Sequence, residues 1–207
     1  MYKLIYVDEQ PEERRAFSRA YDDDFELTTH HPQQDIEECL DYIINEHFDG
    51  VVTDFKLNEH ANINYTGTDL VDRLLEAREG FPVFVLTGYP NGDGDPAIDH
   101  VSDVNIIYNK NELTIEKPRT LLKDKIFTNI KNYQARIAES SQRLNVLVEK
   151  EILSPKEESE LLKLDGFIER AIDKESTLPD SIKKEFIHKK FDDLISLGNE
   201  ILESHKK

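Results

Sequence analysis

Acidic, hydroxyl and basic side chains lie at the ends of four of the five short apolar runs in the first half of this 207-residue sequence. Asp8 and Glu9 follow the first run, Asp54 ends the third, Thr87 ends the fourth and Lys110 follows the fifth. In a parallel sheet, the loops at the carboxyl ends of the strands converge on one crevice. If the apolar runs are parallel strands, these five side chains are therefore expected to lie together.

Such a group is suited to phosphoryl transfer. Three crowded carboxylates repel one another, and a hard divalent cation such as Mg²⁺, which prefers oxygen ligands, relieves that repulsion. The metal would neutralise the transferred phosphate, and a carboxylate can attack it to give an acyl phosphate. Lys110 can pair with one phosphate oxygen, and the Thr87 hydroxyl can donate a hydrogen bond to another.

The apolar runs alternate with helical patterns as far as residue 110. Alternation of this kind predicts an α/β fold with a doubly wound, five-stranded parallel sheet and helices on both faces. The stretch 88–103 is polar and is predicted to hold only a short helix. The runs predict strands at 4–7, 25–29, 50–54, 81–87 and 104–108, helices at 12–20, 36–48 and 67–79, and a loop from 56 to about 66.

After Pro118 the pattern becomes helical only. Apolar residues at 126, 130, 133, 137, 144 and 147 predict one long helix from 118 to about 152. Pro155 opens a second helix that ends near Lys174, and a third is predicted from 180 to about 203. Three helices joined by short turns indicate a small antiparallel helical bundle or a coiled-coil arm with a hairpin. The region has no grouping of nucleophile, base and metal ligands, so a catalytic activity there is the least favoured function.

The balance of acidic and basic residues also changes near Pro118. Residues 1–117 hold 9 Lys and Arg against 26 Asp and Glu, whereas residues 118–207 hold 17 of each. An acidic surface repels nucleic-acid phosphate, and the neutral part has no compensating basic stripe, so binding to nucleic acid is not favoured. No apolar run approaches the 18 or so residues of a spanning helix, and the N-terminus lacks a secretory signal, so a cytoplasmic protein is expected.

Five stretches in the first part resemble the response-regulator receiver domain of bacterial two-component signalling: IYVDEQPEERR, GVVTDFKL, TGTDLVDRL, FPVFVLTGYP and VNIIYNK. The resemblance implies a flavodoxin-like receiver fold over about the first 117 to 130 residues. It implies that Glu9 and Asp54 bind Mg²⁺ directly, that Asp8 binds it through water, and that the carbonyl of Lys56 completes the protein ligands.

The resemblance further implies that Asp54 is the phosphoacceptor. A histidine kinase, a phosphotransfer protein or a small phosphodonor would supply the phosphoryl group. Thr87 and Lys110 would then move towards the phosphate and reshape the face made by the fourth helix, fifth strand and fifth helix of the receiver fold.

Four features depart from the family pattern. Glu9 stands where many receivers have a second aspartate, and Asn111 follows the lysine where a proline is usual. Ile107 occupies the family's aromatic switch position, while the neighbouring Tyr108 is expected to face the other side of its strand. The loop after Asp54 is also longer than usual.

The sequence is therefore interpreted as a receiver domain over 1–130, followed by a helical output or dimerisation region over 131–207 that is not recognised. The predicted function is a phosphorylation-controlled protein–protein interaction switch, with a downstream protein partner or a homodimer formed through the helices. Two alternatives stay open: a pseudo-receiver that serves only as a docking module, and a DNA-binding transcriptional response regulator. No enzymatic activity is expected beyond slow hydrolysis of the protein's own acyl phosphate.

Overall fold

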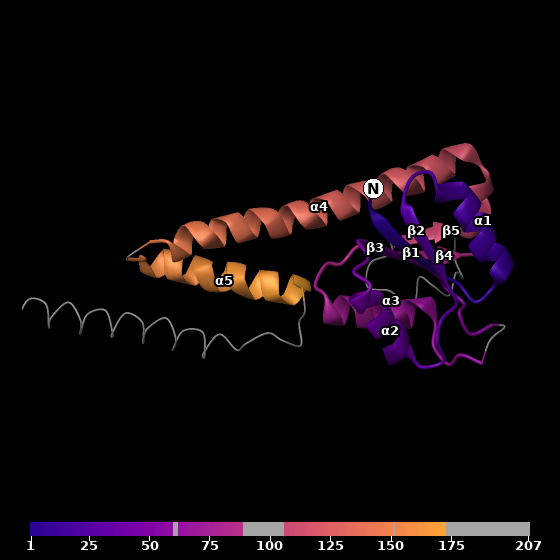
Figure 1. Ribbon diagram of the computed structural model, residues 1–207, viewed down its shortest axis with the longest axis horizontal. Coiled ribbons are helices and arrows are strands. Elements are labelled where there is room, and N and C mark those ends of the chain that lie inside the picture. Colours follow the sequence, from indigo (N-terminus) through magenta and orange to yellow (C-terminus); the bar gives the residue numbers. More distant parts are fainter. Residues whose placement is uncertain (60–61, 89–105, 151, 173–207) are drawn as a thin grey trace, which may run out of the picture. The chain divides into compact units, whose positions relative to one another are not determined.

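The computed structural model describes residues 1–59, 62–88, 106–150 and 152–172 (Figure 1). The chain divides into two compact units, Met1–Arg136 and Ile137–Lys207, and the boundary lies inside one long helix, α4 (Glu116–Val148). The short helix predicted within 88–103 and the last helix predicted over 180–203 lie outside the described residues.

The first unit contains a five-stranded parallel sheet with the strand order β2-β1-β3-β4-β5. This order confirms the predicted doubly wound α/β class. The fifth strand begins and ends later than predicted, and the first part of its predicted range lies outside the described residues. The strands are β1 (Lys3–Val7), β2 (Glu26–His30), β3 (Gly50–Asp54), β4 (Val83–Thr87) and β5 (Ile107–Asn109).

Helices cover both faces of this sheet (Figure 1). On one face lie α2 (Ile36–Asn45) and α3 (Gly67–Ala77), and on the other lie α1 (Pro11–Tyr21) and the first turns of α4. Burial of apolar side chains on both faces is the main favourable term for such a fold. The α4 side chains in this core are Leu122, Ile126 and Ile130, each at most 1% exposed.

Local sequence signals determine where the helices of the first unit begin. Pro11 starts α1, where its missing N–H leaves no hydrogen bond unmade. In α3, the Thr66 side chain accepts from the N–H of Asp69, and the Asp69 carboxylate accepts from the N–H of Thr66. This reciprocal capping box stabilises the first turn by roughly 1 kcal/mol. It also fixes the end of the loop that passes the carboxyl end of β3.

The described part of the second unit is a helical hairpin formed by the last turns of α4 and by α5 (Pro155–Ile172). Arg143 of α4 donates two hydrogen bonds of 2.8 Å to the Glu160 carboxylate of α5. The α4 helix begins two residues before Pro118 and ends four residues before Ile152, the limits predicted for it. Among the described helices, none is long and apolar enough to cross a membrane.

Candidate functional site

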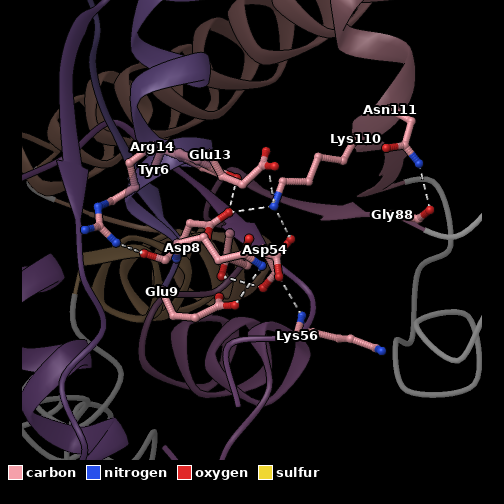
Figure 2. Close-up of polar contacts among 12 residues, drawn as sticks. Tyr6, Asp8, Glu9, Glu13, Arg14, Asp54, Lys56, Gly88, Lys110 and Asn111 are labelled. Atoms are coloured by element: carbon pink, nitrogen blue, oxygen red, sulfur yellow. Dashed lines mark hydrogen bonds and ion pairs between the residues drawn. The ribbon is translucent and has the colours of Figure 1, made fainter. Parts of the chain in front are cut away.

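Asp8 lies at the carboxyl end of β1, where its side chain is fully buried. One carboxylate oxygen, Oδ1, accepts a 2.7 Å hydrogen bond from the N–H of Gln10. The other, Oδ2, accepts from the Tyr6 hydroxyl at 2.5 Å and from the Lys110 ammonium at 2.7 Å (Figure 2). Both oxygens therefore have donors, as a buried carboxylate requires.

Asp54 ends the neighbouring strand β3 and lies beside Asp8. Its Oδ2 accepts a 2.9 Å hydrogen bond from the N–H of Lys56, and its Oδ1 accepts from Lys110 at 2.8 Å. The same ammonium is 3.5 Å from a carboxylate oxygen of Glu13 on α1. Figure 2 shows Lys110 reaching between these carboxylates from the end of β5. A residue 102 positions away in sequence thus joins the ends of β1 and β3.

Burial and charge act on this pair in opposite directions. Burial raises the pKa of the Asp54 carboxyl, and the Lys110 ammonium offsets only part of that rise. Burial lowers the pKa of Lys110, but Asp54 and Asp8 together raise it by more, so that the net shift is upward. Lys110 is therefore a permanent cation in this site at physiological pH.

Glu9 provides a test of whether the site suits a cation. Its side chain is buried, and one oxygen, Oε1, accepts a 3.1 Å hydrogen bond from Gln10. The other oxygen, Oε2, is buried and has no hydrogen-bond partner among the described residues. Burial raises the pKa of this carboxyl. An unsatisfied carboxylate oxygen beside two further carboxylates is a donor set that fits Mg²⁺.

In its present arrangement this set is paired with Lys110. Among the described residues, no three acidic, histidine or cysteine side chains are grouped so that they could hold a metal ion. The Lys56 carbonyl, which the resemblance implies as a ligand, accepts a 3.4 Å hydrogen bond from the N–H of Glu59. Binding of a divalent cation therefore requires these groups to rearrange.

Thr87 ends β4 and is almost fully buried, at 1% exposed. It lines an open pocket of about 290 Å³ together with Asp54, Lys56 and Lys110. Together with Asp8 and Glu9, these are all six residues that the sequence analysis selected. The structure brings them to one edge of the sheet.

Gly67, the first residue of α3, lies against the backbone at the carboxyl end of β3. Its N–H donates a 2.8 Å hydrogen bond to the carbonyl of Phe55. A Cβ atom at this position would lie 2.0 Å from the carbonyl oxygen of Asp54. Only glycine allows this close approach, so the long loop after Asp54 returns to the strand end at a fixed point.

Two hydrogen bonds at the site were not predicted from the sequence. Tyr6 reaches Asp8 because residues two apart on a strand face the same side, so the signal was present in the spacing. Asn111, at the position where the family usually has proline, donates a 2.8 Å hydrogen bond to the carbonyl of Gly88. This bond ties the loop after β5 to the loop after β4.

Ile107, at the switch position, and its neighbour Tyr108 face opposite sides of β5, as predicted. Ile107 packs in the core on the side of α2 and α3. Tyr108 packs on the other side, with its ring 6.1 Å from that of Phe84 and the Lys125 ammonium 4.8 Å above it. No aromatic ring therefore occupies position 107, and Tyr108 is held on the other face of the strand.

The strand order and the position of the acidic residues define the class of fold. Asp8 and Asp54 end β1 and β3, the strands between which the order of the sheet reverses. In flavodoxin-like folds, ligands and reactive groups lie at this switch point, outside the carboxyl ends of the strands. The first unit therefore has the flavodoxin-like fold to which receiver domains belong.

Comparison with solved structures finds similar chains among receiver proteins. A response regulator receiver domain protein from Clostridium thermocellum is 20% identical, over 65% of this chain and 98% of that chain, with a TM-score of 0.47. A CheY-like receiver domain from Methylobacillus flagellatus is 16% identical, over 60% and 98%, with a TM-score of 0.44. The RcsB response regulator of Salmonella typhimurium is 19% identical, over 89% and 82%, with a TM-score of 0.45. No protein-family model and no curated protein matches the sequence.

Proposed function

We propose that the first unit is a response-regulator receiver in which Asp54 accepts a phosphoryl group. The observation that supports this most directly is the Lys110 ammonium, which lies 2.8 Å from Asp54 and 2.7 Å from Asp8 at the switch point of the sheet. The Thr87 hydroxyl lines the same pocket. Transfer of a phosphoryl group to an aspartate needs a carboxylate nucleophile with a cation and a hydroxyl group beside it.

Glu9, Asp8, Asp54 and the Lys56 carbonyl would hold Mg²⁺ in this proposal. When bound, the cation would neutralise negative charge on the phosphoryl group. One Asp54 oxygen attacks phosphorus, the bond from phosphorus to the donor breaks, and an acyl phosphate forms. Oδ1 is suited to the attack because it faces Lys110, which can pair with a phosphoryl oxygen as the bond forms.

Lys110 and Thr87 then bind the phosphoryl oxygens. When Lys110 moves to the phosphoryl group, Asp8 loses one of its donors but keeps the Tyr6 hydroxyl and the N–H of Gln10. The buried carboxylate therefore stays satisfied through the change. Asn111 moves with the lysine loop, so its bond to the Gly88 carbonyl offers a route from Lys110 to the loop after Thr87.

The output is proposed to be a change in protein–protein contact through the helical region. The α4 helix contributes core residues to the first unit and one arm of the hairpin in the second. The hairpin exposes apolar side chains, among them Val148 at 62% and Ile172 at 56%. A histidine kinase or phosphotransfer protein is the proposed source of the phosphoryl group, and a second copy or a downstream protein is the proposed partner.

Intact mass spectrometry tests the acceptor assignment. After incubation with Mg²⁺ and acetyl phosphate, the parent protein should gain the mass of one phosphoryl group, and Asp54→Ala should gain none. Asp23→Asn changes an exposed aspartate at the end of α1 and should behave as the parent does. Phosphorylation of Asp54→Ala to the parent's level would refute the assignment.

A docking module that is never phosphorylated is the second candidate. It is favoured by one observation: the Lys110 ammonium is paired with both Asp8 and Asp54, which ties up the two acids at the switch point. Absence of any mass gain in the parent, with acetyl phosphate and with a panel of kinases, would support this candidate over the receiver switch.

A further inference from the structure

A second pocket lies behind the acceptor site, on the α1 face of the sheet. It has a volume of about 270 Å³ and is formed by α1, β4, the 3-10 helix η3 (Lys110–Thr114) and the start of α4. Its apolar lining includes Phe17, Tyr21, Leu86 and Leu113. All of its residues belong to the first unit.

The charges around this pocket are opposite to those of the domain as a whole. Three cations line it, Arg19, Lys110 and Arg119, together with one acid, Glu13, and Lys110 is already paired with Glu13, Asp8 and Asp54. Residues 1–117 as a whole hold 9 Lys and Arg against 26 Asp and Glu. A cationic pocket in so acidic a domain attracts anions from solution.

Two of these cations have no ion-pair partner among the described residues, namely Arg19 and Arg119. Other basic side chains of the domain are paired: Arg15 with Glu12, and Arg73 with Glu37. Arg119 is partly buried, and its backbone carbonyl accepts a hydrogen bond from the Tyr21 hydroxyl at 3.3 Å. The pocket therefore combines an apolar floor with two guanidinium groups whose hydrogen-bonding capacity is not used by another described side chain.

We propose that this pocket binds a small organic anion with an apolar body, such as an aromatic carboxylate. The apolar side chains would cover the ring, and a guanidinium would hold the carboxylate through two parallel hydrogen bonds. Small-molecule sites have this composition, mostly apolar with a few polar groups, and start at roughly 300 Å³. A volume of about 270 Å³ suits a ligand of about the size of benzoate.

The position of the pocket gives the bound anion a route to the acceptor site. Lys110 and Glu13 line both pockets, and the Lys110 ammonium is 2.8 Å from Asp54 (Figure 2). An anion on the far side of Lys110 competes with Asp54 for the same positive charge. By linkage, weakening the Lys110–Asp54 pair should in turn strengthen binding of the anion. This coupling rests on the acceptor site described above, whereas binding itself does not require phosphorylation.

The test is an NMR titration of the full-length chain with benzoate at constant ionic strength. Benzyl alcohol, which has a similar shape and no charge, is the comparison probe. Saturable shift changes at the amides of Tyr21, Leu113 and Arg119 are expected with benzoate and not with benzyl alcohol. Equal responses to the two probes, or no saturable response to benzoate, would overturn the proposal.

Variants separate the pocket from general charge effects. Arg119→Gln should weaken benzoate binding about tenfold or more, because a charge-assisted bidentate contact is lost. Arg19→Gln changes an exposed side chain, leaves the fold intact and should also weaken binding. Arg15→Gln lies on the same helix outside the pocket and should bind as the parent does. If Arg15→Gln weakens binding as much as the other two, the pocket is not the site.

A last variant keeps this inference separate from the proposed function. Asp54→Ala cannot be phosphorylated at position 54, yet it should bind benzoate at least as tightly as the parent. Tighter binding would support the coupling through Lys110. Weaker binding would contradict the coupling, whether or not the parent protein accepts a phosphoryl group.

Discussion

Replacing Gly67 with alanine should disrupt the carboxyl end of β3. The added Cβ would lie 2.0 Å from the carbonyl oxygen of Asp54 and 2.9 Å from its carbonyl carbon. Ordinary van der Waals contact begins at 3.4 Å, so the two backbone segments must separate by about 1.4 Å. Neither segment is free to move, because Phe55 is hydrogen-bonded to both Leu86 and Gly67 at 2.8 Å.

The size of the effect follows from these contacts. Overpacking a core costs about 1–3 kcal/mol, and a contact between two backbone segments lies at the upper end of that range. Loss of the bond from Gly67 to Phe55 adds about 1 kcal/mol. The better helix propensity of alanine offsets up to about 1 kcal/mol. The free energy of unfolding of the first unit should therefore fall by about 3 kcal/mol.

Urea unfolding followed by circular dichroism measures this change. At a typical urea dependence, a loss of about 3 kcal/mol lowers the midpoint by about 1 M or more. Gly88→Ala is the matched control, because a Cβ at position 88 meets no heavy atom of the described residues within 4 Å. A Gly67→Ala variant as stable as Gly88→Ala would refute the reasoning about this close approach.

Three further predictions concern stability. Tyr6→Phe removes a buried hydrogen-bond donor to Asp8 and should lower the free energy of unfolding by about 1–3 kcal/mol in the same urea assay. An unchanged free energy would show that this hydrogen bond is not needed for stability. Ile126→Ala should lower the free energy of unfolding by about 2–5 kcal/mol, because the side chain is fully buried. Leu121→Ala, at a side chain that is 54% exposed, should lower it by about 0.5 kcal/mol or less. Equal losses would argue against packing of α4 on the sheet. The pKa of Glu9 is raised in the fold, so its ionisation opposes folding and stability falls as pH rises from the ordinary glutamate pKa of 4.5 towards the raised value. Glu9→Gln should remove that fall, which urea midpoints measured in chelator across this pH range would detect; an unchanged pH profile would contradict it.

Much of the first unit could be predicted from the sequence because its central strands β3 and β4 are fully buried. A strand covered on both faces reads as a continuous apolar run, as in Gly50–Asp54 and Val83–Thr87. Once the strands are parallel, topology places the residues at their carboxyl ends together, and the six selected residues do lie together. Helix limits were less exact. Pro118 was read as the first helical residue, but proline is tolerated anywhere in a first turn, and α4 begins at Glu116.

The partners within the site were harder to predict. Lys110 and Asp8 are 102 positions apart, and the sequence does not show that one ammonium would bridge two carboxylates. The spacing places Tyr6 and Asp8 on the same side of β1, but Tyr6 also reads as one apolar residue of a buried strand, so its hydrogen bond to Asp8 was not predicted. Asn111 was recognised as a departure from the family pattern, but its hydrogen bond to Gly88 depends on how two loops approach each other.

The Lys110 ammonium acts as an internal counter-ion for the buried acids at the switch point. Some small metal-binding domains fold only when their metal is bound. Here a lysine supplies a positive charge to both Asp8 and Asp54 from within the chain. In the proposed receiver, Mg²⁺ would then be needed for accepting a phosphoryl group and not for offsetting the charge of these two acids.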